Sequence, residues 1–395
     1  MATNTLLTSS IITREAQRIL HQKLNFITNI NRQYDDSFAK TGAKNGATLG
    51  IRLPNKFSVR TGATYSAQNS VETKVDLTVA TQKGVDFEFS SAELTLSVDD
   101  FSKRYLEPAM STLAATMEAD ALSMCSDVWN YVGADGSALT LKNAFEAGKA
   151  LTDNLAPLSM RSVILDTQGR VDLLDATKGL FQDSTAIGKQ YVEGKLGRMG
   201  GFEWYENTLV PRFTSGTAAT TTGYLINGAA QSGATMTVDT GTTTLLVGDV
   251  ITIANVFRVH PETKVSTGVL QKFVITANSG SSATSLAISP AIVATGVNQN
   301  VNAVPADNAA VSAFLGNAAA VDQSLAFHKD AFAFVSADLE MPKGTDMAAR
   351  EVMDGLSMRF VRDFSISDDL FKSRFDVLYG YKAIRPELAC RIISN

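Results

Sequence analysis

The chain has 395 residues, a formal net charge of −5 and an apolar share of 45%. That length exceeds what one hydrophobic core usually supports, so the sequence predicts two or three folded units. The acidic balance, with a pI near 5.4, argues against a dedicated nucleic-acid binder, which would carry a basic stripe to neutralise phosphates, and leaves open a protein that merely lines a surface near DNA.

The first ten residues lack the basic segment and the long apolar run of a secretory signal. No stretch approaches about 18 uncharged apolar residues, the length that a membrane span needs. We therefore expect a soluble chain that is made and kept in the cytosol. The two cysteines, Cys125 and Cys390, have no second cysteine or histidine nearby, and we expect both to be buried free thiols.

The segment from residue 10 to residue 31 predicts an amphipathic helix. Its apolar residues recur at helical spacing, and Ser9 or Ser10 can cap the first turn. Arg14, Arg18 and Lys23 make this arm locally basic. Two interpretations stay open: the charges form a solvated helix face, or they dock an acidic partner.

Residues 42–90 change from helical to alternating periodicity. Strict alternation runs from Val71 to Val79, and glycines such as Gly42, Gly62 and Gly84 punctuate the segment. This pattern predicts a long two-stranded arm with little of its own to pack against. Because an isolated hairpin is marginal in water, we expect the arm to lie on a neighbouring subunit.

Pro108 opens a helical pattern that runs to Gly133 with one apolar, methionine-rich stripe. About 24 residues would span roughly 36 Å and form the spine of a domain. A shorter helix near residues 141–151, a buried strand at 162–166 and a helix near 168–178 follow, so helix and strand mix here. A glycine-rich loop comes next and carries Gly194, Gly197, Gly200 and Gly201.

Residues 214–320 form a charge-poor block: only seven of its 107 residues are charged, against 68 of the other 288. Composition shifts sharply at both edges, as it does where one domain is inserted into another. The block is rich in Thr, Ser, Gly, Ala and Val, and its β-branched runs are broken by Gly248 and Asp249, which predicts a small all-β module. Its charged residues are Asp239, Asp249, Arg258, Glu262, Lys264, Lys272 and Asp307.

After the block, two apolar strands flank a polar break at His328, Lys329 and Asp330, which we interpret as a hydrogen-bonded turn. Further strand patterns occupy residues 356–366, 373–379 and 383–392. A sheet built from both sides of the block follows, which makes the host one α+β unit with a discontinuous chain.

No catalytic constellation is apparent. The sequence has no nucleophile elbow, dinucleotide fingerprint, phosphate loop or zinc-protease motif. His21, His260 and His328 are far apart, and we expect each at a surface or in a turn. Carboxylate pairs such as Asp99-Asp100 and Asp368-Asp369 sit where helix starts or turns are expected. The sequence therefore predicts no enzyme, no cofactor and no metal site.

The order of these elements resembles the major capsid proteins of tailed double-stranded-DNA bacteriophages, which share the Hong Kong 97 fold. Four segments make the resemblance specific: VGDVITIANVFRVHPETK (247–264), QKFVITA (271–277), LAFHKDAF (325–332) and YGYKAIRPELA (379–389). They are similar to the coat proteins of short-tailed Salmonella-type phages, the branch with an extra β-barrel insertion domain. The resemblance covers essentially the whole chain and is strongest after residue 240.

The resemblance implies an α+β fold of the Hong Kong 97 type with an inserted all-β, barrel-like domain. It divides the chain into an N-terminal arm (1–41), an extended hairpin called the E-loop (42–97), and a peripheral domain that holds the spine helix and starts the axial domain (98–213). The insertion domain follows (214–320, with a core at about 232–316). The axial domain and terminal strands complete the chain (321–395).

The implied function is a major capsid protein that assembles into an icosahedral procapsid in the host bacterial cytoplasm and becomes part of the virion. The implied partners are other copies of itself in hexamers and pentamers, a scaffolding protein, a portal protein and packaged double-stranded DNA held by non-specific contact. Decoration proteins stay open, and no membrane is involved. Arg14, Arg18 and Lys23 are the candidate scaffold contact.

Two further expectations concern how subunits hold together. Some relatives crosslink their shells through a lysine and an asparagine, and Lys56, Lys74 or Lys83 could supply the lysine, but the insertion-bearing branch is not expected to do so. Because the insertion carries so few charges, we expect it to stabilise its host by packing rather than by salt bridges, and to touch neighbouring insertions through polar contacts.

Three alternative classes remain at this stage. A bacterial surface or adhesin-like protein would also be β-rich, although the missing signal peptide argues against it. An encapsulin-type compartment would share the host fold without the insertion. A hydrolase would need polar groups that converge from distant segments.

Overall fold

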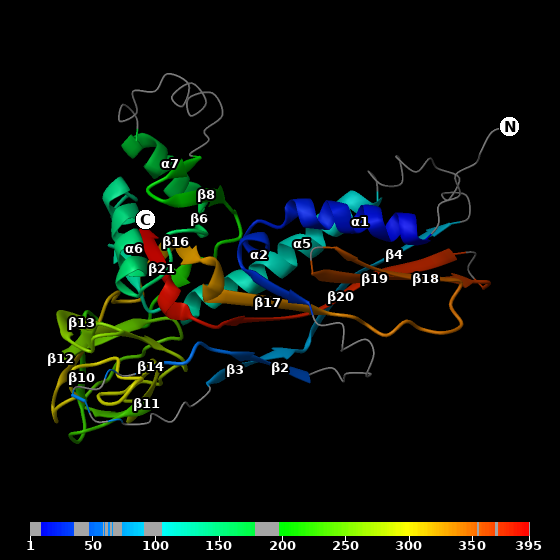
Figure 1. Cartoon of the computed structure of the whole chain (residues 1–395). Coiled ribbons are helices and arrows are strands. Elements are labelled where there is room, and N and C mark those ends of the chain that lie inside the picture. Colours follow the sequence, from blue (N-terminus) through cyan, green and yellow to red (C-terminus); the bar gives the residue numbers. More distant parts are fainter. Residues whose placement is uncertain are drawn as a thin grey trace. The chain divides into compact units, whose positions relative to one another are not determined.

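The computed structural model describes residues 9–34, 47–57, 59, 62–63, 65, 73–90, 105–177, 197–353, 355–367 and 370–394. The chain divides into two compact units, each built from several segments. Unit 1 consists of Met1–Ile51, Lys74–Leu122 and Phe332–Ile384. Unit 2 consists of Arg52–Thr73, Ser123–Ala331 and Arg385–Asn395. Figure 1 shows the elements of both units in sequence colours.

Unit 1 packs helices on a six-stranded sheet. Its helices are α1 (Ser9–Lys23), α2 (Phe26–Asn29) and α5 (Glu107–Leu122). The strand order is β1-β17-β20-β19-β18, and β4 pairs with β20. Helix α1 packs against both α5 and β18 (Figure 1). The strands are β1 (Asn31–Tyr34), β4 (Thr81–Ser90), β17 (Phe332–Ala337), β18 (Met347–Met353), β19 (Leu356–Ser365) and β20 (Leu370–Ala383).

The N-terminal helix is interrupted, which the sequence pattern did not predict. Helix α1 ends at Lys23, and α2 begins at Phe26. The buried carboxylate of Glu118, on α5, accepts hydrogen bonds from the backbone N–H of Phe26 at 2.9 and 3.1 Å and of Ile27 at 3.3 Å. A side chain 92 positions away in the sequence therefore caps the second helix, and local periodicity cannot reveal such a cap.

The predicted spine helix from Pro108 to Gly133 is too long. Helix α5 ends at Leu122, a 3₁₀ helix follows at Ser123–Asp127, and Tyr131–Gly133 form strand β5. Strand β5 pairs in parallel with β21 (Ala389–Ser394). This long-range pairing decides the end of the helix, because Tyr131 and Val132 fit a strand at least as well as a helix.

The predicted arm at residues 42–90 does not stand free where the structure describes it. Strands β2 (Ala47–Arg52) and β3 (Lys74–Val79) pair with each other, and β4 pairs along its full length with β20 of the same unit. Buried Leu77 and Val79 pack on Ala333, Val335 and Ala337 of β17. Much of the arm therefore packs within its own chain, contrary to the expectation that it has little to pack against, while its position on a neighbouring subunit stays a prediction.

One glycine of β4 is required by this packing. A Cβ at Gly84 would lie 2.5 Å from the carbonyl oxygen of Phe375 and 2.7 Å from Asp376 Oδ1. The glycine that interrupts the predicted strand pattern at position 84 therefore permits β4 and β20 to approach closely and does not form a turn.

The host part of unit 2 is a seven-stranded sheet with order β5-β21-β16-β6-β8-β7, and β9 pairs with β16. Helices α6 (Leu141–Asp153) and α7 (Thr167–Thr177) confirm the two predicted helices. Strands β6 and β8 precede the charge-poor block and β16 and β21 follow it, so one sheet combines strands from both sides, as predicted. The remaining bounds are β6 (Arg161–Leu165), β7 (Arg198–Met199), β8 (Phe202–Glu206), β9 (Phe213–Thr214) and β16 (Ala320–His328).

The charge-poor block folds into a closed six-stranded β-barrel with order β10-β11-β14-β13-β12-β15, so the predicted all-β module is confirmed. Its ends meet, since Thr214 of β9 pairs with Ala320 of β16. The suggested core of 232–316 starts too late, because β10 closes the barrel by pairing with both β11 and β15. The strands are β10 (Thr221–Ile226), β11 (Gly233–Asp239), β12 (Val250–Val259), β13 (Ser266–Ile275), β14 (Ser285–Ile292) and β15 (Ala310–Ala313).

The segment 321–395, expected as one axial region, is divided between the units. Strand β16 belongs to unit 2, the chain contributes Phe332–Ile384 to unit 1, and β21 belongs again to unit 2. The long antiparallel ladder between β20 and β4 keeps residues 332–384 with the spine helix. The host is therefore two units rather than one.

Candidate functional site

The described residues hold no cluster of metal-ligating side chains. Among them, no three His, Cys, Asp or Glu side chains are grouped to hold a metal ion, and no helix is long and apolar enough to cross a membrane. Cys125 and Cys390 are buried free thiols, as predicted, and burial raises the pKa of each to about 12. The pairs Asp99-Asp100 and Asp368-Asp369 lie outside the described residues.

The polar break after β16 is the predicted turn, with one difference. A 3₁₀ helix occupies Lys329–Ala331, and the N–H of Asp330 donates to His328 Nδ1 at 3.2 Å. His328 itself is only 3% exposed, so of the two expected places, a surface or a turn, it occupies the turn. Burial lowers the pKa of this imidazole, which accepts at Nδ1 and is therefore neutral.

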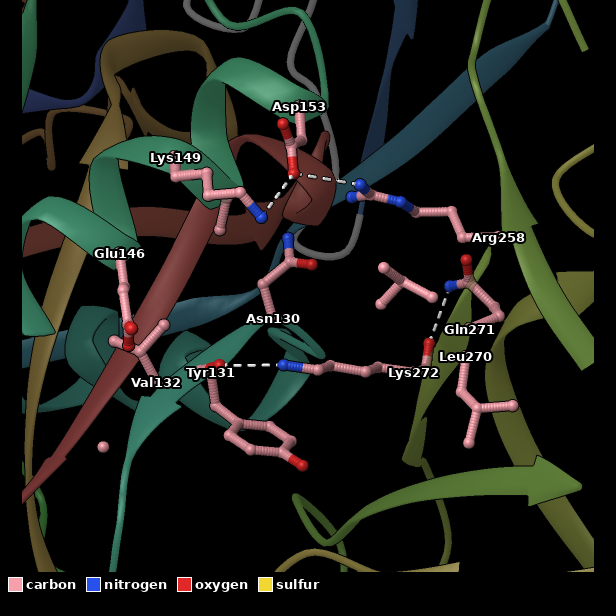
Figure 2. A pocket seen from close by; sticks show the side chains of 13 residues that line it. Asn130, Tyr131, Val132, Glu146, Lys149, Asp153, Arg258, Leu270, Gln271 and Lys272 are labelled. Carbon is pink, nitrogen blue, oxygen red and sulfur yellow. Dashed lines mark hydrogen bonds and ion pairs between the residues drawn. The ribbon is translucent and has the colours of Figure 1, made fainter. Parts of the chain in front are cut away.

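The most elaborate polar arrangement in unit 2 is the barrel–host junction, where the barrel meets α6, β5 and β21. A cavity of about 490 Å³ lies at this place, and Figure 2 shows the side chains that line it. One side is formed by Glu146, Lys149 and Asp153 from successive turns of α6. The opposite side is formed by Arg258 of β12 and Lys272 of β13.

Lys272 crosses the junction from the barrel to the host. Its Nζ donates to the backbone carbonyl oxygen of Tyr131 at 2.9 Å and lies 3.8 Å from the centre of the Tyr131 ring (Figure 2). Strand β5 is the last strand of its sheet among the described residues, so one of its edges lacks a strand partner. The ammonium group therefore satisfies a carbonyl on an open sheet edge, and burial lowers the pKa of Lys272.

Arg258 makes the second crossing. Its Nη2 donates to Asp153 Oδ2 at 3.1 Å, and Lys149 Nζ lies 3.5 Å from the same oxygen (Figure 2). The expectation that the charge-poor block relies on packing without salt bridges is wrong here, because one of its few charges forms an ion pair with the host.

Arg391 makes the third crossing, from the host to the barrel. Its Nη2 donates to the carbonyl oxygen of Gly248 at 2.7 Å, and its guanidinium lies 5.2 Å from the centre of the Phe213 ring. The side chain is fully buried, and that burial lowers its pKa. Arg391 and Lys272 thus come from opposite sides, and each ends on a backbone carbonyl of the other side.

The turn that presents Gly248 is built by its neighbour. Asp249 Oδ2 accepts from the N–H of Leu246 at 2.7 Å and of Gly216 at 3.0 Å, and burial raises the pKa of this carboxyl. Gly248 has φ +94°, and a Cβ there would lie 2.8 Å from the Phe213 ring. The Gly-Asp pair that indicated a strand break is therefore also the docking turn of the barrel.

Sequence reasoning missed the host side of the junction. Tyr131 was placed inside a helix, and Arg391 inside an ordinary strand. A usable signal existed for the barrel side: Arg258, Lys272 and Asp249 are three of the seven charges in a block that otherwise avoids charge. A charge kept in such a block indicates a specific partner.

The residues predicted to contact a scaffold lie elsewhere, on α1 of unit 1. Arg14 Nη2 is 3.9 Å from Glu351, and Arg18 forms hydrogen bonds of 2.6 and 2.9 Å with Glu15 on its own helix. The side chains of Arg14 and Arg18 are 77% and 51% exposed. The side chain of Lys23 lies outside the described part of the structure.

The lysines considered for crosslinking have their own surroundings. Lys74 Nζ lies 3.3 Å from Asp76, and Lys83 Nζ lies 3.5 Å from Asp120, so both have carboxylate neighbours. Lys56 is exposed.

The family described as P22 coat protein, gene protein 5, matches residues 1–392. The chain belongs to the P22 coat protein family. It is a major capsid protein of the P22-like type, a structural and non-enzymatic component of the virion that assembles icosahedral heads. The expected fold, a Hong Kong 97-type capsid fold with an inserted barrel, is confirmed by this membership together with the closed barrel.

No curated protein sequence matches this coat protein. Among solved structures it is similar to that of Mycobacterium phage Che8, with TM-score 0.47, 14% identity, and coverage of 93% of this chain and 90% of that one. It is also similar to the mature capsid of bacteriophage PhiM1, with TM-score 0.44, 12% identity, and coverage of 93% of this chain and 86% of that one. The CUS-3 coat protein I-domain is 31% identical over 24% of this chain and 97% of its own, with TM-score 0.19.

Proposed function

We propose that the inserted barrel braces the host sheet of each coat protein subunit during head assembly. The observation that supports this is a reciprocal pair of cations, the half-buried Lys272 on the carbonyl of Tyr131 and the buried Arg391 on the carbonyl of Gly248. Hydrogen bonds to charged groups contribute more than neutral ones and are directional, so they fix orientation as well as affinity.

The barrel contacts the two strands at one end of the host sheet, as the structure describes it. Strand β5 is an edge strand, and β21 beside it carries Arg391. An open edge invites pairing with another chain, which would compete with correct assembly. Because Lys272 occupies the Tyr131 carbonyl, the barrel covers part of that edge.

The test uses single substitutions rather than removal of the barrel, since deleting residues 232–316 would leave β10 without its partners β11 and β15. We expect Arg391→Met to lower the yield of closed shells seen by electron microscopy and to raise the share of aberrant particles. The control is Arg212→Met, because the Arg212 side chain is 60% exposed. Equal yields of closed shells for Arg391→Met and wild type would contradict the brace.

We further propose that subunits form hexamers and pentamers around a scaffolding protein, with a portal protein and non-specifically held double-stranded DNA as later partners. The family supports self-assembly, and the exposed cations of α1 support an acidic scaffold segment as the partner of Arg14, Arg18 and Lys23. Helix α1 buries Ile12, Ala16 and Leu20 while the arginines stay exposed.

Charge reversal tests the scaffold contact. Arg14→Glu combined with Lys23→Glu should reduce scaffold co-sedimentation and procapsid yield, while Lys142→Glu on α6, where the side chain is 81% exposed, should not. Unchanged scaffold content in the α1 variant would contradict this assignment and leave the brace untouched.

A further inference from the structure

The loop between α6 and β6 presents an unusual surface. Leu155, Leu158 and Met160 are 43%, 73% and 67% exposed, and they lie within six consecutive positions of unit 2. Large apolar side chains that gather at one exposed place mark interaction sites more often than isolated ones do.

The loop is held in a fixed shape by Arg161, which is only 5% exposed. Arg161 Nε donates to the carbonyl of Pro157 at 2.7 Å, and its Nη2 donates to the carbonyl of Ala156 at 2.7 Å and to Thr152 Oγ1 at 3.1 Å. One buried guanidinium therefore replaces the backbone bonds that a loop of this length lacks.

The backbone of the loop is also strained. Leu155 has φ +62° and Met160 has φ +54°, in the left-handed region that bulky residues avoid. Such conformations persist where the surroundings enforce them, and they gather at binding and functional sites. Here the strain and the buried arginine together hold apolar side chains in solvent, which gives no benefit to the isolated subunit.

The surroundings of Met160 carry charges of both signs. The N–H of Lys329 donates to the carbonyl oxygen of Met160 at 3.1 Å, and the side chains of Lys329 and Asp330 are exposed. The Asp330 carboxylate lies 3.7 Å from His328 Nδ1 and also faces solvent. An apolar centre beside a neighbouring cation and anion suits contact with an identical chain, because a patch of a single sign would repel its own copy.

We propose that the loop Leu155–Met160 is a preformed contact with a second copy of this coat protein. The proposal rests on the assembly of the family into shells and not on the barrel brace or the scaffold contact. A preformed loop loses little conformational entropy on binding, so it contributes to association more than a flexible loop of the same composition. Leu158 and Met160 supply the apolar anchors, and Lys329 and Asp330 supply the polar rim.

Cysteine protection tests the proposal. Leu158→Cys should react rapidly with a maleimide in the folded subunit, because the natural thiols Cys125 and Cys390 are buried. We expect labelling to slow about tenfold or more in closed shells, both with scaffold and after its removal. Lys142→Cys on α6 is the matched control, since its side chain is 81% exposed, and its rate should not change as much.

Several outcomes would overturn the proposal. Equal labelling of Leu158→Cys in subunits and shells would mean that nothing covers the loop. Protection only while scaffold is present would make the scaffold the partner instead of a second copy. Equal slowing of the Lys142→Cys control would mean that the shell excludes the reagent, with no contact at the loop. Shells are counted in each variant preparation and in a parallel wild-type preparation. A variant that fails to assemble is therefore recognised before its labelling is compared.

A double variant separates an effect on folding from an effect on the contact. Met160→Asn suits the left-handed backbone, and Leu158→Asp changes an exposed side chain, so the double variant should unfold at the wild-type temperature or above it. We expect its shell yield to fall about tenfold at the wild-type assembly concentration. Wild-type yield from this stable variant would overturn the proposal.

Discussion

The interior of the barrel and its junction with the host are stabilised in opposite ways. The interior is a continuous apolar core that includes Tyr224, Ile253 and Phe273. In the charge-poor block, the buried polar residues are Ser215, Thr222, Asp249 and Gln271, and the last two lie at the junction. The barrel therefore folds by apolar burial, which has no direction, and is oriented on its host by charged groups, which do.

Apolar contact at the junction is small by comparison. Two small clusters lie there: Trp129, Val250 and Val274, with Tyr131 and Phe314 packed on them, and Phe213, Leu315, Val321 and Ile393. So few side chains can hold two bodies together without setting their orientation. We therefore expect core substitutions to destabilise the barrel itself, and junction substitutions to loosen its attachment to the host.

The largest effect is expected inside the barrel. Ile253→Ala removes a fully buried side chain and leaves a cavity, so we expect the free energy of unfolding to fall by about 4 kcal/mol in urea titration. Val265→Ala, at a position 65% exposed, should change it by less than about 0.5 kcal/mol. A loss below about 1 kcal/mol for Ile253→Ala would mean that the barrel core does not limit stability.

Arg391→Met should come next, at about 3 kcal/mol, since it leaves the Gly248 carbonyl unpaired and takes a cation from the neighbourhood of Asp249. The same urea titration measures it, with the exposed Arg212→Met as control. If Arg391→Met left the free energy of unfolding unchanged or raised it, the buried charge of Arg391 would not stabilise the junction.

Lys272→Met should have a smaller effect, about 1 kcal/mol at neutral pH, because losing the bond to Tyr131 is partly offset by not burying an ammonium. Its pH dependence is more informative. Burial lowers the folded-state pKa of Lys272 below 10.5, so the unfolded chain binds the proton more tightly and wild-type stability gains from this group as pH rises toward 10.5. The Met variant should lack that gain, and parallel curves for the two proteins from pH 7 to 10 would disagree with a buried Lys272.

The smallest effect concerns His328. Its pKa is lowered by burial from 6.5, so as pH falls below that value the unfolded state takes up a proton that the folded state resists, and stability is lost. His328→Asn should flatten the fall of thermal stability between pH 7.5 and pH 5. If wild type and variant decline alike, other groups dominate acid sensitivity.

Much of the fold was predictable because local composition marks the inserted barrel and local periodicity marks several helices and strands. The charge-poor block ends at Thr214 and Ala320, and these residues pair with each other at the neck of the barrel. Helices α6 and α7 follow from local pattern and from caps such as Thr140, whose Oγ1 accepts the N–H of Asn143 at 3.3 Å.

The remaining features depend on contacts between distant residues, which no local pattern records. The break between α1 and α2 follows from Glu118, and the end of α5 follows from the pairing of β5 with β21. Arg391 looked like any arginine in a strand, because its partner Gly248 lies 143 positions away. The loop at Leu158 escaped notice because its left-handed residues are not glycines.

Hydrogen exchange on the folded subunit, comparing wild type with Arg391→Met, tests most directly whether buried cations fix the barrel to its host. We predict that amides of the barrel interior, such as those of β12, keep their protection in the variant, while those at Tyr131–Gly133 and around Gly248 exchange faster. Uniformly faster exchange across the barrel, or no change at the junction, would contradict this division between a self-sufficient core and a charge-directed joint.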